Sequence, residues 1–527
     1  MRRRTLLIAA PVLATAVACH SGATDAPGRT GPAARSTSPV TTSPATPTTP
    51  RSSRPRAAAD WTALGHGLDG KLVRPGDADY PAARQLYNTR FDNLKPAAVA
   101  YVADEADIRE CLAYAQAHHV PVSIRNGGHS YAGWSSGNGH LVIDVSKLSH
   151  ISADGTIGAG AKLVDVYETL GRSSRSLPGG SCPTVGISGL TLGGGHGVAS
   201  RAYGLTCDAL TSATLITADG RRITASGKEN KDLFWALRGA GNGQFGVVTE
   251  LTFRTHTAPQ TVSAYLSWPW SKARAVIDAW QKWGPDQPDE IWSSAHLEAT
   301  AGGGVPGLTV AAFSLGSYGG LQNAVDRLAD AVGASASSVS LRRHSYEQAM
   351  LLYAGCAGLS EDQCHLPGPT PGRRARGALQ RDTYAAASDF YDRAVPAAGI
   401  AALLSRVEGF ARLPAAQGAG SVALTALGGA INRVDPSATA FVHRRSRVLA
   451  QYVASWRPGT AGSAQQAWLK STHAAMGPYA SGGAYQNYSD PSLTGWRTAY
   501  YGDGASRLTA LKKRYDPERV FSFPQAL

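Results

Sequence analysis

The chain has 527 residues, of which 43% are hydrophobic and 17% charged, a composition typical of a globular protein. Its formal net charge is +13, but eight Arg and one Asp fall in residues 1–59, so +7 belongs to the N-terminal tail. The remaining +6 is spread without a Lys or Arg block, which argues against a nucleic-acid partner. The 468 residues from Asp60 onward are enough for two or three domains.

The first 59 residues predict export. Three arginines precede an apolar run from Leu6 to Ala18, which is too short to span a membrane and ends in small residues, so we expect residues 1–18 to be a signal peptide. Cys19 follows directly and leaves open a lipid anchor, the only membrane contact we expect, while Arg3-Arg4 leave open twin-arginine export. Residues 19–59 are rich in Ser, Thr, Pro and Ala, which predicts a disordered linker that holds the protein at the cell surface or outside the cell.

Ordered structure is expected from about Trp61. Apolar spacing predicts a helix over residues 107–118 and a strand over 120–124 that ends at the string Arg125-Asn126-Gly127-Gly128-His129-Ser130. A second buried strand is expected over 141–145, and a hairpin over 213–226 that turns at Asp219-Gly220. Such short strands mixed with helices predict an α+β domain.

Two glycine-framed strings each carry one nucleophilic side chain. The first holds His129, and the second runs from Gly180 through Cys182 to Gly186 and on to Gly193-Gly194-Gly195-His196-Gly197. Glycine lets the backbone approach a ligand closely, and successive amide N–H groups can bind a pyrophosphate. A histidine in a turn and a small buried thiol are the simpler interpretations of either residue alone.

Together these strings resemble the berberine bridge enzyme-like family of FAD-linked oxidases, within the vanillyl-alcohol-oxidase superfamily. Tyr203-Gly204-Leu205, residues 232–239 and the ending from Tyr515 to Gln525 carry the same resemblance. It implies a two-lobed α+β fold: a PCMH-type FAD-binding domain (60–261), an antiparallel-sheet substrate domain (262–480) and a C-terminal segment (481–527) that returns to the FAD domain. It also implies FAD bonded covalently through His129 to the 8α-methyl group and through Cys182 to C6. The expected cofactor-binding residues are Arg125, Asn126, Gly127, Gly128, His129, Ser130, Cys182, Thr184, Val185, Gly186, Gly189, Gly193, Gly194, Gly195, Gly197, Gly246, Val247 and Asn487.

A second glycine pattern, Gly241 to Gly246, matches the dinucleotide fingerprint G-x-G-x-x-G. That fingerprint requires a strand before it and a helix after it. Here residues 232–238 predict a helical turn and 247–253 alternate like a strand, so we reject a nicotinamide site and assign the loop to flavin contact or packing. In the second lobe, a strand is expected over 308–313 and a helix over 322–332.

The string Tyr485-Gln486-Asn487-Tyr488 selects the candidate base. By the family resemblance Tyr488 faces the flavin, and loss of a hydroxyl proton to it is reasonable chemistry for oxidation of an alcohol or carbohydrate CH–OH group. A free phenol has a pKa near 10, so a cation or hydrogen bonds would have to lower it. A tyrosine that only packs is the alternative.

The resemblance also identifies departures. Thr425 stands where relatives can carry a catalytic glutamate or tyrosine, so berberine-bridge chemistry itself is not expected; Gly502 or Gly504 stands where the family commonly has asparagine. Val185 occupies the position that resembles an oxygen gate, which favours an oxidase that reduces O2 to H2O2. A secondary-metabolite tailoring oxidase, a flavin dehydrogenase with another acceptor and a non-catalytic surface binding protein remain alternatives.

The six cysteines divide by context. Cys356 and Cys364 lie eight residues apart in a polar stretch and predict a local disulfide, whereas Cys111 and Cys207 have apolar neighbours typical of buried thiols. No Cys/His spacing predicts a metal site.

Overall fold

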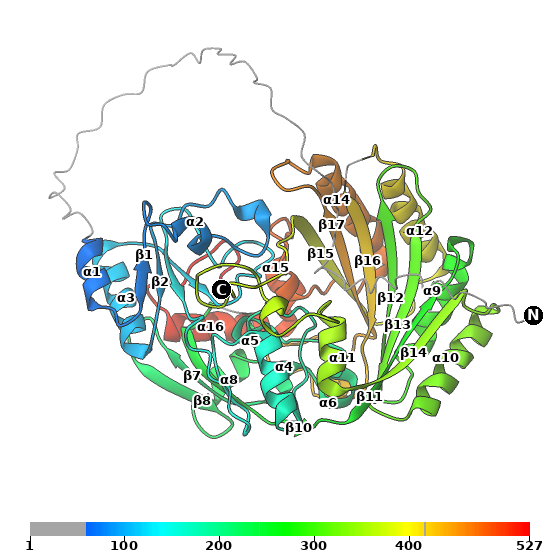
Figure 1. Ribbon diagram of the computed structural model, residues 1–527, viewed down its shortest axis with the longest axis horizontal. Coiled ribbons are helices and arrows are strands. Elements are labelled where there is room, and N and C mark those ends of the chain that lie inside the picture. Colours follow the sequence, from blue (N-terminus) through cyan, green and yellow to red (C-terminus); the bar gives the residue numbers. More distant parts are fainter. Residues whose placement is uncertain (1–59, 242, 416–417) are drawn as a thin grey trace, which may run out of the picture.

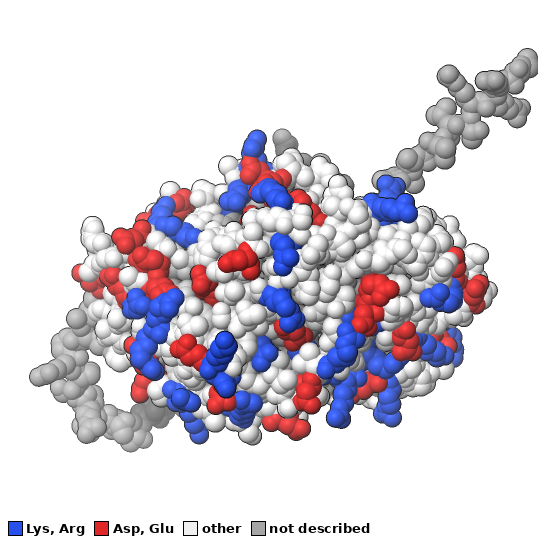
Figure 2. All heavy atoms as spheres, turned by 90° about the horizontal axis from the view of Figure 1, so that it is seen from below, with Lys and Arg blue, Asp and Glu red and all other residues white. Residues whose placement is uncertain are grey.

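The computed structural model describes residues 60–241, 243–415 and 418–527, so the expected signal peptide and linker lie outside the described residues. Figure 1 shows two lobes side by side, one with the N-terminal elements in blue and cyan and one built around a long sheet in green, yellow and brown. No helix in the described ranges is both long and apolar enough to span a membrane. On the face seen in Figure 2, acidic and basic side chains of the described residues are interspersed.

The first sheet has the order β1-β2-β4-β3 and delivers the His129 loop. Strands β2, β4 and β3 run parallel, and β1 pairs antiparallel with β2. The helix between β2 and β3 is capped by Asp104, whose side chain accepts hydrogen bonds from the backbone N–H groups of Ala106 and Asp107. The elements are β1 (Lys71–Val73), β2 (Ala98–Tyr101), α3 (Glu105–His118), β3 (Val122–Arg125) and β4 (Leu141–Asp144).

A second, antiparallel sheet of the same lobe has the order β5-β9-β7-β8. The expected hairpin is confirmed, with Ser212 opposite Ser226, and the strand expected over 247–253 is β9. The elements are β5 (Thr156–Gly158), β7 (Leu210–Ile216), β8 (Arg222–Ser226) and β9 (Val247–Phe253). Shorter elements around them are α1 (Trp61–Gly67), α2 (Tyr80–Ala83), α4 (Leu163–Arg172), β6 (Arg175–Ser176), α5 (Ile187–Leu192), α6 (Ser200–Tyr203), α7 (Thr206–Ala209), α8 (Lys231–Ala236) and β10 (His256–Thr257).

The second lobe is a seven-stranded antiparallel sheet in the order β14-β11-β13-β12-β16-β17-β15. Its strands are β11 (Gln260–Ser267), β12 (Ile291–Thr300), β13 (Gly307–Ser314), β14 (Ser338–Ser345), β15 (Tyr384–Tyr391), β16 (Ala419–Ala426) and β17 (Val448–Ser455). Helices on the outer side of this sheet in Figure 1 bury an apolar cluster against it. The helices of this part of the chain are α9 (Ala273–Trp283), α10 (Tyr318–Val332), α11 (Tyr346–Tyr353), α12 (Ala397–Ala411), α13 (Ala430–Arg433) and α14 (Ser463–Met476).

The opposite face of this sheet joins the core of the first lobe. Trp292 and Phe313 belong to the same buried cluster as Ile143, Leu215 and Leu251 of the two smaller sheets. Apolar burial of this kind stabilises the contact by about 25 cal/mol per Å². The two lobes therefore share one core.

The C-terminal helices return to the first lobe, as the sequence analysis expects. Helix α16 (Ala505–Tyr515), red in Figure 1, lies with the N-terminal lobe, and α15 (Trp496–Tyr501) precedes it. Lys512 on α16 is buried and donates hydrogen bonds to the carbonyl oxygens of Gln244 and Phe521, each at 2.7 Å. The end of the chain is thus held against the loop before β9.

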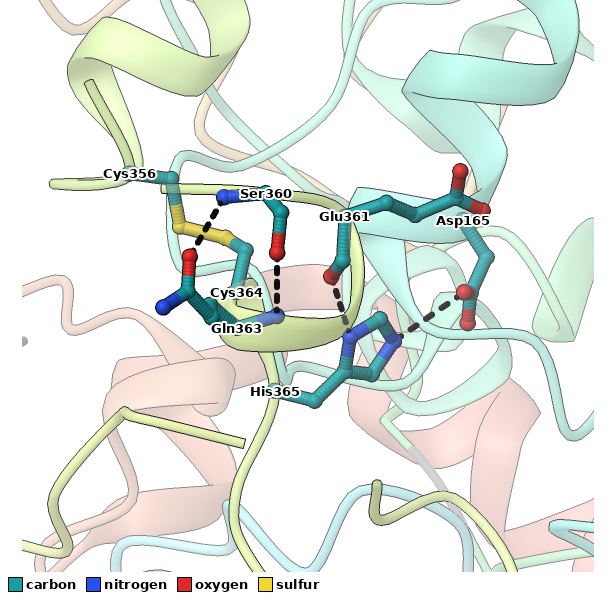
Figure 3. Close-up of a disulfide and its surroundings, with 7 residues drawn as sticks. All are labelled: Asp165, Cys356, Ser360, Glu361, Gln363, Cys364 and His365. Atoms are coloured by element: carbon teal, nitrogen blue, oxygen red, sulfur yellow. Dashed lines mark hydrogen bonds and ion pairs between the residues drawn. A yellow bond between two sulfur atoms is a disulfide. The ribbon is translucent and has the colours of Figure 1, made fainter. Parts of the chain in front are cut away.

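The expected disulfide joins Cys356 and Cys364, and Cys111 and Cys207 are buried thiols. Figure 3 shows the disulfide loop against α4, where Nε2 of His365 lies 3.0 Å from Oδ1 of Asp165. The disulfide thus closes the loop on itself, and the ion pair between His365 and Asp165 holds the loop against the first lobe.

Candidate functional site

One large cavity receives residues from both lobes. It encloses about 1770 Å³, counted with its opening to solvent, and Gln451 of β17 forms part of its wall. The expected site residues that line it are Arg125, Asn126, Gly127, Gly128, His129, Ser130, Cys182, Val185, Gly186, Gly189, Gly246, Asn487 and Tyr488. The fold therefore gathers four segments, which extend from Arg125 to Tyr488 along the chain, around one space.

The end of β3 places His129. Arg125, the last residue of the strand, is buried and bonds through Nε to Oδ2 of Asp144 on β4 at 2.5 Å. The backbone then turns at Gly128, whose φ of +69° favours glycine, and its carbonyl accepts from the N–H of Tyr87 at 3.1 Å. This turn projects the imidazole of His129 into the cavity.

His129 is held on two sides. Its ring stacks on Tyr87 with centroids 4.0 Å apart, and its Nε2 lies 2.8 Å from Oγ1 of Thr184. Burial lowers the pKa of His129 to about 3, with a further contribution from the charge of Lys162. The imidazole is therefore neutral at ordinary pH and has a free electron pair on one nitrogen.

The segment after Gly180 brings Cys182 and Val185 to the cavity. Its carbonyl at Thr184 packs so tightly on Gly127 that no Cβ fits there, and Gly186 packs in the same way on the side chain of Asn126. Two glycines thus let the two strings lie backbone against backbone. Cys182 lines the cavity, and a bond from its sulfur to a cofactor needs the thiolate form.

Tyr488 lies on the short turn Gln486–Tyr488 and also lines the cavity. Its ring stacks on Tyr131 at 5.1 Å, and its hydroxyl lies 2.6 Å from Nε2 of His196. Burial raises the pKa of Tyr488 well above its usual value, and Tyr131 and Tyr485 raise it further. The surroundings as a whole therefore do not lower the pKa of Tyr488, although its proposed role as a base requires this. His196 provides a hydrogen-bond partner for its hydroxyl group.

Six expected cofactor residues are set back from the wall. Gly193 packs against the side chain of Asn487, Gly197 against the carbonyl of Gly179, and Thr184 reaches the site through His129. Close packing, rather than contact with a ligand, explains why Gly193 and Gly197 cannot be replaced by residues with a side chain. The residues outside the lining are Thr184, Gly193, Gly194, Gly195, Gly197 and Val247.

Among the wall residues that sequence reasoning missed are Tyr131, His196 and Gln451. Tyr131 follows His129 by two positions and His196 stands inside the second glycine string, so proximity could have selected both. Gln451 lies in an ordinary buried strand and carries no local signal. Thr425 is buried in β16 and does not line the cavity.

The G-x-G-x-x-G loop lies between helix α8 and strand β9, which confirms the reversed order. Gly241, Gly243, Gln244 and Gly246 line the cavity. The loop therefore contacts the ligand space without the helix N-terminus of a nicotinamide site.

The cavity fits FAD by its unpaired polar atoms. Four buried side-chain atoms of its wall have no hydrogen-bond partner among the described residues: Nη1 of Arg125, Nδ1 of His196, Oε1 of Gln486 and Oε1 of Gln525. Buried polar groups are almost always paired, so these atoms indicate a polar ligand. FAD supplies ring, ribityl and pyrophosphate atoms of both donor and acceptor type, so fold and site define a flavoenzyme.

Comparisons with known proteins also indicate a flavoenzyme. Residues 96–226 match the family described as "FAD binding domain", and residues 484–527 match "Berberine and berberine like". The chain is 30% identical to the "Uncharacterized FAD-linked oxidoreductase YgaK" of Bacillus subtilis (strain 168), over 87% of this chain and 97% of that protein. It is 29% identical to the chitooligosaccharide oxidase of Gibberella zeae, over 84% and 89% of the two chains.

A solved structure extends the agreement to the fold. The structure of Physcomitrella patens BBE-like 1 has a TM-score of 0.79 and 29% identity, and the match covers 88% of this chain and 98% of that one. The chain therefore belongs to the berberine bridge enzyme-like family of FAD-linked oxidases, and it is an FAD-linked oxidoreductase. The predicted family, fold class and enzyme class are confirmed.

Proposed function

We propose that this protein oxidises a CH–OH group of a carbohydrate with FAD bonded to both His129 and Cys182, and that O2 is the electron acceptor. One observation carries the proposal: His129, Cys182 and Tyr488 line a single cavity, together with the glycines of the loop before β9. Bound FAD supplies the redox chemistry by accepting the carbon-bound hydrogen with two electrons. The protein residues hold the substrate and take up the hydroxyl proton.

The contacts of His129 support attachment through Nδ1. Thr184 engages Nε2, and the neutral ring can carry its one proton there, which leaves the electron pair of Nδ1 for the flavin. Cys182 lines the same cavity, and its thiolate is the second attachment point. Two bonds to one ring fix its position in the cavity.

The side chains around Tyr131 support the proposal of a substrate with hydroxyl groups. Gln451 donates from Nε2 to the hydroxyl of Tyr131 at 2.8 Å, and Tyr131 stacks on Tyr488. Aromatic faces beside amide and hydroxyl groups suit a sugar, which presents C–H surfaces and many hydroxyl groups. The chitooligosaccharide oxidase among the relatives agrees with this substrate class.

Val185 supports the proposal that O2 is the electron acceptor. Its side chain lines the cavity, and its backbone N–H bonds to the carbonyl of Cys182 at 3.2 Å, so it lies beside the proposed thioether. A small side chain there leaves room for O2. The overall reaction balances as CH–OH + O2 giving C=O + H2O2.

The test begins with the purified, FAD-loaded protein. Peptide mass spectrometry, with and without prior disulfide reduction, is expected to find FAD mass on peptides that contain His129 and Cys182, and acid precipitation is expected to leave the yellow colour in the pellet. A peroxide-coupled screen of oligosaccharides and alcohols then identifies the substrate. Reduction of a dye but not O2 would indicate a dehydrogenase, activity only on non-sugar alcohols a tailoring oxidase, and loss of all flavin to the supernatant would overturn the covalent assignment.

The proposal includes export. Arg2 to Ala18 and the Ser/Thr/Pro/Ala-rich residues 19–59 support a cleaved signal and a spacer at the cell surface. N-terminal sequencing of the exported protein tests this: a start at or just after Cys19 agrees with it, with a lipid on Cys19 as the anchored form, whereas an intact Met1 contradicts it.

A further inference from the structure

We propose that His196 is a positioning residue for Tyr488 that accepts the phenolic proton while Tyr488 takes the hydroxyl proton of the substrate. This relay rests on the proposed function of Tyr488 as base. It assigns to this chain a second proton-transfer group, four residues after Leu192, where α5 ends.

The geometry of the pair is fixed from both sides. The hydroxyl of Tyr488 lies 2.6 Å from Nε2 of His196, with the rings nearly perpendicular at 86°. The hydroxyl of Tyr485 accepts from the N–H of Gly195 at 2.8 Å, and the N–H of Gly197 donates to Oγ of Ser200 at 2.9 Å. The backbone on each side of His196 is therefore anchored, and the short bond to Tyr488 is built into the fold.

Tyr488 needs an acceptor for its own proton. Its raised pKa keeps it a phenol at neutral pH, and a phenol oxygen cannot take the substrate proton unless its own proton leaves. The titratable groups that face it are Tyr131, Tyr485, Tyr384 and His196. The three tyrosines have raised pKa values themselves, so only the imidazole can accept.

His196 is suited to accept a proton for a short time. Burial lowers its pKa to about 4, so the ring is neutral before reaction. With Nε2 as acceptor, the ring proton lies on Nδ1, a buried atom that has no hydrogen-bond partner among the described residues.

The step balances. The substrate O–H bond breaks as a bond to the Tyr488 oxygen forms, and the Tyr488 O–H bond breaks as a bond to Nε2 forms, which leaves His196 with one positive charge. The carbon-bound hydrogen and two electrons leave the substrate for FAD at the same time, which adds a negative charge to the same cavity and offsets the charge on His196. The extra proton leaves His196 when O2 takes up the electrons.

Two substitutions separate a proton acceptor from a simple hydrogen-bond partner. His196→Gln keeps an amide that can bond the phenol but cannot hold an added proton, and His196→Phe removes both. We expect each to slow anaerobic flavin reduction, measured per bound FAD, by about 100-fold at pH 7, the lower range for general acid–base catalysis. The variants should regain rate as pH rises, whereas the wild type stays flat above about pH 5. A His196→Gln rate within threefold of wild type would overturn the relay.

A second readout does not depend on substrate. In 15N-histidine-labelled, FAD-loaded protein, the Nε2 resonance of His196, assigned by its loss in His196→Gln, is expected at the position of an unprotonated nitrogen and to move in Tyr488→Phe. A protonated Nε2 would overturn the relay by making His196 the donor. If no sugar or alcohol reduces the flavin, the proposed function fails, and the resonance still decides the direction of this bond.

Discussion

Oγ1 of Thr184 lies 2.8 Å from Nε2 of His129, so one hydroxyl group holds the orientation of the imidazole proposed to bond the flavin. The ring is neutral because burial lowers its pKa to about 3, and a neutral imidazole has one donor and one acceptor nitrogen. When Thr184 accepts the proton of Nε2, the electron pair of Nδ1 is left for the flavin.

Thr184→Val replaces this hydroxyl with a methyl group of similar size. In a Cys182→Ala background, where His129 is the only proposed attachment point, we expect the fraction of covalently bound FAD to fall at least tenfold, because the ring loses the hydrogen bond that holds its orientation. Fluorescence of the denatured protein band measures that fraction. Thr184→Ser keeps the hydroxyl and should retain most covalent FAD; equal labelling of the Val and Ser variants would contradict this role.

Val185→Leu adds one methylene to the cavity wall beside Cys182. We expect reoxidation by O2 to slow about tenfold or more, while anaerobic reduction by substrate changes less than twofold, because only the path of O2 is narrowed. Stopped-flow absorbance measures both half-reactions. Val185→Ala is the matched control and should reoxidise at least as fast as wild type; a slow half-reaction with substrate would place Val185 in substrate binding instead.

The local sequence pattern predicted individual strands and helices, including a strand next to the proposed FAD site. The strand expected over 247–253 is β9 with the same bounds, because its apolar residues alternate with polar ones between a glycine loop and Arg254. The helix expected over 322–332 begins earlier, at Tyr318, because Ser317 caps it by accepting from the N–H of Gly320. Two adjacent glycines hid that first turn from a propensity argument.

The site was predictable only where its residues share a string. Cys182 and Val185 reach the cavity with Gly186 as neighbours in sequence, but Gln451 arrives from β17 through a sheet register that no local pattern specifies. The contact between His196 and Tyr488 spans 292 residues, so it depends on the return of the C-terminal segment to the first lobe. Long-range pairing of this kind is set by tertiary packing.

Lys512→Met tests how the end of the chain closes the cavity. The ammonium group is buried and bonds Oδ2 of Asp516 at 2.7 Å besides two carbonyl oxygens, so its loss leaves a buried carboxylate without its cation. We expect the free energy of unfolding to fall by about 3–5 kcal/mol, together with weaker retention of FAD, because Gln244 and Phe521 line the cavity. Thermal unfolding measures the first effect. Lys513→Met changes the exposed neighbour and should be nearly neutral; equal effects of both variants would contradict the prediction.

Glu168 makes stability depend on pH near the disulfide loop. Burial, followed by the charge and hydrogen bond of Glu361, raises the pKa of Glu168 to about 7. Because this folded-state pKa lies above the unfolded value of about 4.3, the stability is fully present below that value and is lost as pH rises through about 7. Glu168→Gln cannot ionise and should avoid that loss.

The melting temperatures of Glu168→Gln and wild type are therefore expected to agree near pH 4 and to differ at pH 8, where the variant should melt about 2 °C higher. Differential scanning calorimetry at both pH values measures this difference. Glu229→Gln removes an exposed carboxylate from the same lobe and should change neither value. A Glu168→Gln variant that is less stable than wild type at pH 8 would show that the charged form of Glu168 stabilises the loop, contrary to its buried position beside Glu361.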